Sequence, residues 1–131
     1  MSAHTRTRQA DATAAGSLIM RFLFIGQGYP GVPGAASGSG VGTYLREITR
    51  GLASQGHECH VVVWSESDAA RRLPGVVEPS SCIEGVHIHP LAHAYWPVIE
   101  RWAPDSRDAH NLRSRVRALD RAHGYDWIEL Q

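Results

Sequence analysis

The stretch that decides the fold runs from Arg21 to Trp64 and reads RFLFIGQGYPGVPGAASGSGVGTYLREITRGLASQGHECHVVVW. It begins with the apolar run Arg21–Ile25 and ends with the apolar run Cys59–Trp64, and both are typical of buried parallel strands. Between the two runs, apolar residues recur at the spacing of one helix face: they are Val41, Tyr44, Leu45, Ile48 and Leu52. A strand, a helix and a strand within about 45 residues predict a βαβ unit with parallel strands and a right-handed crossover.

The loop after the first strand is rich in glycine and proline. Glycine stands at positions 26, 28, 31, 34, 38, 40 and 42, with Pro30 and Pro33 among them, so a long exposed loop is expected. Ser39 or Thr43 can cap the helix that follows, and Gly56 lies where a left-handed residue would end it. A helix N-terminus preceded by glycines favours phosphate or sugar binding. The candidate binding residues are therefore Gly38, Ser39, Gly40, Val41, Gly42 and Thr43, although a flexible linker would have the same composition.

The remaining chain continues the alternation of strands and helices. A strand is expected over Val86–Pro90. A helix is expected to follow, with Asp105 or Ser106 as its cap and Gly124 at its end. Tyr125–Leu130 is expected to form a fourth strand. This order predicts a doubly wound parallel α/β sheet with its ligand crevice at the carboxyl ends of the strands. Residues 1–20 are polar and without periodicity, so they are expected to be a disordered tail, or a segment upstream of a true start at Met20.

The residues around the first helix resemble a known family. The run Gly40–Ile48, followed by Leu52 and by the Gly-His-Glu of residues 56–58, is similar to the N-terminal signature of family 4 retaining glycosyltransferases of the GT-B fold. Two later segments, Glu84–His89 and Tyr125–Glu129, also resemble that family. The chain departs from the family at Ser39, which replaces the first glycine of a pair, and at Cys59, which replaces a valine.

The resemblance implies that residues 21–131 form part of a Rossmann-like N-terminal, acceptor-side domain. Such enzymes move a sugar from a nucleotide-sugar donor, which is a substrate and not a cofactor, to a carbohydrate or small-molecule acceptor with retention. By resemblance, residues 38–43 meet the donor diphosphate or sugar. The resemblance also implies an acceptor cleft near Tyr29, Tyr44, Glu129 and Gln131. A second, C-terminal domain that grips the nucleotide does not fit in 131 residues, so we expect a fragment that is inactive alone.

The composition indicates which classes of binding partner and which cellular compartment to expect. With 13 basic and 13 acidic residues the formal net charge is zero, which argues against nucleic acid as a partner. Two cysteines do not suggest a disulfide scaffold, so a reducing cytoplasm is expected. No apolar stretch is long enough to span a membrane, and any membrane contact is expected to be peripheral.

Other patterns and function classes compete with this interpretation. Gly26–Gly31 matches the letters of a dinucleotide-binding fingerprint, but prolines intervene and the helix starts about ten residues later, so that interpretation is rejected. His87, His89 and His93 lie close together in the sequence and could suggest a metal site. Pro90 breaks the strand before His93, however, and no metal site is expected. Two alternatives stay open: a non-catalytic binding or assembly module that pairs with a separate donor domain, and a small nucleotide-binding Rossmann-like protein.

Overall fold

The structure is a computed structural model that describes residues 3–5, 18–36, 40–67, 70–71, 76–92 and 104–131. Its six-stranded sheet has the order β1-β6-β2-β3-β5-β4. The four central strands are parallel: they are β2 (Arg21–Gly26), β3 (Glu58–Trp64), β5 (Val86–Leu91) and β6 (Trp127–Leu130). The strand order therefore reverses between β2 and β6, which is the topological switch point of a doubly wound sheet.

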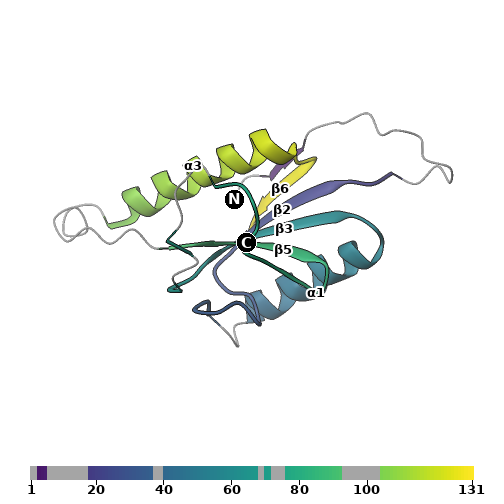
Figure 1. Ribbon diagram of the computed structural model, residues 1–131, viewed down its shortest axis with the longest axis horizontal. Coiled ribbons are helices and arrows are strands. Elements are labelled where there is room, and N and C mark those ends of the chain that lie inside the picture. The colour runs from purple at the N-terminus through teal and green to yellow at the C-terminus, as the bar shows by residue number, and fades with distance from the viewer. Residues whose placement is uncertain (1–2, 6–17, 37–39, 68–69, 72–75, 93–103) are drawn as a thin grey trace.

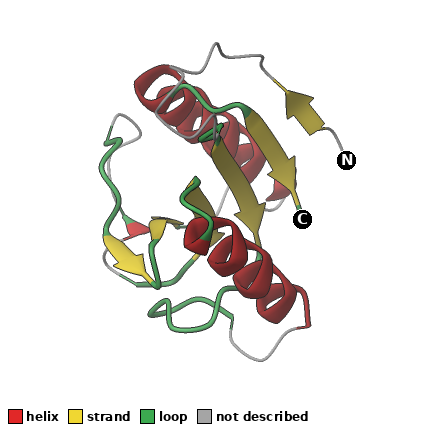
Figure 2. Cartoon of the chain, turned by 90° about the vertical axis from the view of Figure 1, so that its right-hand side faces the viewer, coloured by secondary structure: helices red, strands yellow, loops and turns green. Residues whose placement is uncertain are grey.

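Two helices cover opposite faces of the sheet. Figures 1 and 2 show α1 (Gly40–Ser54) on one side of the strands and α3 (Pro104–His123) on the other. Leu45 of α1 packs with Phe24, Val61 and Ile88 in one core cluster. Leu119 of α3 packs with Leu23, Val62 and Tyr125 in a second cluster. Alternate residues of β2, β3 and β5 face the two clusters, as the period of a strand requires, and the predicted doubly wound α/β fold is confirmed.

The C-terminal ends of both helices follow the predicted signals, whereas the predicted cap of α3 was wrong, because α3 begins at Pro104 and Asp105 and Ser106 lie inside its first turn. Gly56 has φ +90° and Gly124 has φ +67°, the left-handed conformation that suits glycine after a helix. At the end of α1 the Gly56 amide donates to Ala53 O at 3.0 Å and the His57 amide donates to Leu52 O at 3.2 Å, which is a Schellman motif. The last strand starts two residues later than predicted, because Asp126 instead bonds through its backbone N–H and its carboxylate to the backbone of Arg21.

Two short edge strands were not predicted. β4 (Ser81–Ile83) pairs antiparallel with β5 through a tight turn, in which Glu84 and Gly85 both have positive φ, as a two-residue hairpin turn requires. β1 (Ala3–Thr5) pairs antiparallel with β6, so the expected disordered tail contains a strand at these residues. Strands of three residues are too short to give a periodic signal in the sequence.

The buried face of α1 differs from the predicted one. Val41 and Tyr44 are 50% and 58% exposed, whereas Leu45 and Thr49 are fully buried. Tyr44 lies about 100° round the helix from Leu45, and Val41 lies in the first turn, before any large side chain of α1 reaches the core. The prediction that Val41 and Tyr44 pack on the sheet was therefore wrong.

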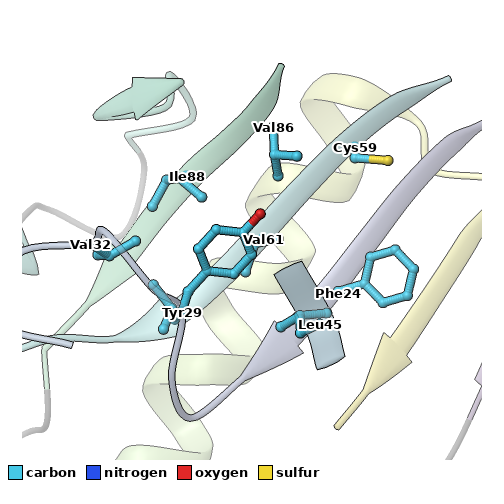
Figure 3. Packing of buried hydrophobic residues seen from close by; sticks show 9 residues of the cluster. Phe24, Tyr29, Val32, Leu45, Cys59, Val61, Val86 and Ile88 are labelled. Carbon is cyan, nitrogen blue, oxygen red and sulfur yellow. The ribbon is translucent and has the colours of Figure 1, made fainter. Parts of the chain in front are cut away.

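A buried hydrogen bond ties the glycine-rich loop to this helix. Tyr29, in the loop, is fully buried, and its side chain lies among Val61, Ile88 and Leu45 (Figure 3). Its hydroxyl lies 2.9 Å from Thr49 Oγ1, and Thr49 Oγ1 donates to Leu45 O at 2.8 Å. Tyr29 is therefore the donor to Thr49. Burial raises the pKa of Tyr29, with the Thr49 hydrogen bond opposing it, so the phenol stays protonated and able to donate.

Substitutions in this pair should have unequal costs. Thr49→Val leaves the buried Tyr29 hydroxyl without its acceptor, so we expect a loss of about 1–3 kcal/mol in the free energy of unfolding. Tyr29→Phe leaves the Thr49–Leu45 bond in place and should cost about 0.5–1.5 kcal/mol. The double variant should cost less than the sum. Urea titrations measure the free energy of unfolding of all three variants. Thr43→Val, at an exposed position, is the control and is expected within about 0.5 kcal/mol of the parent. A double variant whose loss equals the sum of the two single losses would contradict the coupling between Tyr29 and Thr49.

Two glycines, one inside α1 and one just after its end, should respond in opposite directions to alanine. Gly51 lies inside the helix with no atom within 4 Å of an added Cβ, so Gly51→Ala should raise the free energy of unfolding by about 0.5–1 kcal/mol. Gly56→Ala should lower it by about 1–2 kcal/mol, since its φ of +90° is unfavourable for alanine. Thermal unfolding of the two variants checks this, and a shift of the same sign in both would show that the helix end is assigned incorrectly.

Candidate functional site

The carboxyl ends of the parallel strands form the edge where a ligand crevice is expected. They gather near the C-terminus in Figure 1. β2 ends at Gly26 beside the end of β6, and the Gln131 amide donates to Ile25 O at 2.8 Å. The reversal of strand order thus falls at Gly26 and Gln131. Open α/β sheets bind their ligands at this point.

The described part of the glycine-rich loop is ordered. Two successive turns, closed by Val32 N to Tyr29 O and Ala35 N to Val32 O, fold it back. A bridge then pairs Gly28 with Ala36. Together with the Tyr29 anchor, these contacts fold residues 27–36 back against the core.

The same loop is joined to the residues that follow β3. The Glu66 amide donates to Gly34 O at 3.0 Å, and Ser65 Oγ donates to Pro33 O at 2.7 Å. Gly34 has φ +75°, and an added Cβ would lie 2.6 Å from Ser67 N. Only glycine allows this close approach of the two segments.

A pocket of about 380 Å³ opens between these two segments. It lies where β2 and β3 end, and its lining combines amide, hydroxyl and carboxylate groups with one aromatic side chain. None of the described residues that line it is basic; they are Gln27, Gly34, Ala35, Ala36, Trp64, Ser65 and Glu66. The pocket can hydrogen-bond a polyhydroxyl ligand, but its lining supplies no positive side chain to neutralise a phosphate.

The start of α1 provides the positive element that the pocket lacks. α1 begins at Gly40, and among the described residues, its chain neighbours and the helix backbone apart, no atom lies within 4 Å of a Cβ added there. The first turn carries no acidic side chain, so nothing on it neutralises the positive end of the helix dipole. Thr43 lies inside this turn and is not the cap, and Val41 is exposed. Gly38 and Ser39, the other candidates of this loop, lie outside the described residues.

The four residues expected near an acceptor cleft fall in different environments. Tyr29 is buried in the core with its hydroxyl on Thr49, so it cannot line a cleft, and that prediction is corrected. Tyr44 is exposed on α1. Glu129 accepts a hydrogen bond from Trp127 Nε1 at 3.1 Å, and Gln131 lies at the switch point.

The pocket residues Gln27, Trp64 and Ser65 were not predicted. Their only signal is that each stands at, or directly after, the end of a strand.

The structure also shows where the residues of the dinucleotide-binding pattern and of the histidine pattern lie. α1 starts at Gly40, nine residues after Gly31, so the third glycine of the fingerprint does not open a helix. His87 and His89 lie on β5, and His93 lies outside the described residues. Instead of a cluster along β5, the structure brings His89 together with His60 of β3 and His123 of α3.

Comparison with known proteins identifies the chain. None of the helices in the described parts of the chain has the length and apolar character to cross a membrane. Comparison with curated proteins gave no match, and comparison with solved structures gave none either. A scan against protein families matches residues 38–131, from the glycine-rich loop to the last residue, to Glycosyltransferase Family 4. This match covers more than half of the sequence, and the chain therefore belongs to Glycosyltransferase Family 4.

Proposed function

We propose that this chain is the N-terminal, acceptor-side part of a retaining glycosyltransferase that uses a nucleotide-sugar donor. The observation that carries the proposal is the open approach to Gly40 at the start of α1, on the loop that also forms the polar pocket at the switch point. The start of α1 meets the donor diphosphate, and residues 38–43 form this contact. The pocket takes hydroxyl groups of the acceptor or of the transferred sugar.

The chemistry follows from where negative charge develops. Sugar transfer releases a nucleoside diphosphate, so the leaving group gains charge as the glycosidic bond breaks. Backbone dipoles that already point at the diphosphate stabilise this charge without reorganising. The positive end of α1 supplies such a dipole, and the absence of an acidic side chain in its first turn favours an anion there.

The same reasoning implies a second set of groups outside this chain. No basic side chain is found among the described residues that line the pocket, and a helix dipole alone balances only about half a charge. We propose that a second domain supplies the positive side chains. Val41 and Tyr44, large apolar side chains exposed beside Gly40, would contact it. A separately encoded donor domain fits this surface equally well. We place the reaction in the cytoplasm, where the free thiols Cys59 and Cys82 stay reduced.

The purified 131-residue chain should not transfer sugar. Without side chains that balance the diphosphate, little transition-state stabilisation remains. Release of nucleoside diphosphate from UDP-, GDP- and ADP-sugars measures this, with and without carbohydrate acceptors. Sugar transfer by the parent chain at a rate above that of the Gly40→Ala variant would contradict the proposal that catalysis needs groups from two domains. Tight NAD or FAD binding would instead support a small nucleotide-binding protein.

The isolated chain should still bind the donor weakly at the start of α1. We expect millimolar affinity, or about −4 kcal/mol, with NMR shift changes in the amides of residues 40–43 on addition of a nucleotide sugar. Gly40→Ala should weaken binding about 10-fold, because its methyl group occupies the approach to the helix start. Gly51→Ala, on the same helix, is the matched control and should bind as the parent does. Shift changes confined to residues 26–31 would contradict the assignment.

A further inference from the structure

A second polar cluster lies on the face of the sheet that α3 covers. His60 of β3 is central to it. The His60 ring stacks on that of His89 with centroids 5.0 Å apart, and it lies 4.5 Å from the ring of His123 at the end of α3 and 4.7 Å from that of His87. His60 and His89 are each 2% exposed. The proposed transferase function makes no use of this cluster.

The ring nitrogens of three of these histidines converge. His60 Nδ1 lies 2.7 Å from His89 Nε2. One nitrogen from each of His60, His89 and His123 lies within 4.8 Å of the others. Three ligands that each lie 2.0–2.1 Å from a tetrahedral zinc ion stand about 3.3 Å apart. The observed spacing brackets that value, so small ring rotations would bring the three nitrogens into a coordination shell.

Two of the rings are oriented by oxygen acceptors on their far sides. His60 Nε2 lies 2.8 Å from Glu58 Oε1, and His123 Nε2 lies 3.0 Å from Val77 O. A carboxylate and a carbonyl only accept, so both Nε2 atoms carry the proton. The lone pair of each ring is then on Nδ1. Histidine ligands of metal ions are oriented in this way, with the other ring N–H held by a carboxylate or a backbone carbonyl.

The Glu58 carboxylate that orients His60 is itself held in place. Arg21 Nε lies 3.0 Å from Glu58 Oε2, while the other carboxylate oxygen, Oε1, faces His60 Nε2. An ion pair therefore fixes the group that orients the His60 ring.

A buried hydroxyl beside the cluster has no hydrogen-bond partner in the part of the chain that the structure describes. Tyr125 is fully buried, and its hydroxyl makes no hydrogen bond with any of the described residues. Its ring lies 5.2 Å from that of His60 and 5.8 Å from that of His123. A buried polar atom of this kind needs a partner. A water molecule in the fourth position of a metal ion, which three protein ligands leave open, would be a suitable one.

We propose that His60, His89 and His123 form a zinc-binding site. Three neutral imidazoles are a ligand set that zinc uses. An ion there would link β3, β5 and the end of α3 on the side of the sheet away from the glycine-rich loop. Its role would be to hold the second core cluster together. The alternative is a metal-free cluster in which His89 donates a hydrogen bond to His60.

Zinc retention by the purified chain tests the proposal. After dialysis against excess Zn²⁺ and then against metal-free buffer, elemental analysis should find one zinc per chain. The thermal unfolding midpoint should rise with zinc and fall again with a chelator. Cobalt in place of zinc should give the intense visible absorption of a tetrahedral nitrogen site. A parent protein that retains no stoichiometric zinc and shows no zinc-dependent shift would overturn the proposal and leave the metal-free cluster.

Matched variants locate the ion. His60→Gln and His89→Gln should each abolish stoichiometric binding, and Glu58→Gln, which removes only the orienting charge, should weaken it about 10- to 100-fold. His110→Gln, an exposed histidine of α3, and Cys82→Ser, an exposed thiol, should bind as the parent does. Parent-like binding by His89→Gln would overturn the assignment. If a histidine variant fails to fold by circular dichroism, Glu58→Gln and the cobalt spectrum of the parent decide.

Discussion

The hydrogen bond between Tyr29 and Thr49 is the interaction on which the architecture of the glycine-rich loop depends. The loop must pass from the end of β2 to the start of α1, and residues this rich in glycine have a high entropic cost of ordering. Tyr29 offsets that cost by burying an aromatic ring and by donating to Thr49 on the helix. At Gly26, an added Cβ would lie 2.6 Å from Leu45 Cδ2, so the absence of a side chain lets the helix pack against the strand end. Strand end, loop and helix start are therefore one packed unit.

The two ends of the sheet carry different kinds of chemical group. At the carboxyl ends, glycines and short polar side chains leave space, and the loops after β2 and β3 are held by backbone hydrogen bonds. At the amino ends, on the α3 face, charged and imidazole groups are packed and mutually paired. Arg21 there binds Glu58 and also donates to His123 O. A binding site needs accessible backbone and polar groups, whereas a stabilising site needs buried and oriented ones. The two kinds of group therefore lie at different places in the same fold.

Much of the fold could be predicted from local patterns, and the failures have physical causes. The apolar runs of β2 and β3 and the glycines after α1 and α3 are local signals, and all were confirmed. Val41 and Tyr44 were assigned to the buried face because periodicity records the spacing of apolar residues, not where the covering sheet ends. Tyr29 was expected near a cleft from the family resemblance alone. Its burial depends on contacts with α1 that begin only at Leu45. His60 and His123 come from distant parts of the chain, so no spacing motif could relate them, and only the packing of α3 on the sheet brings them together.

The most direct test of the proposed donor site is a crystal structure of this chain soaked with a nucleotide sugar. We expect the diphosphate within hydrogen-bonding distance of the backbone of residues 40–43, with the sugar directed toward the pocket between Gln27 and Ser65. A diphosphate bound instead at Gly26–Gly31 would mean that the loop is a dinucleotide-type site, and it would contradict the assignment of the α1 start as the donor contact.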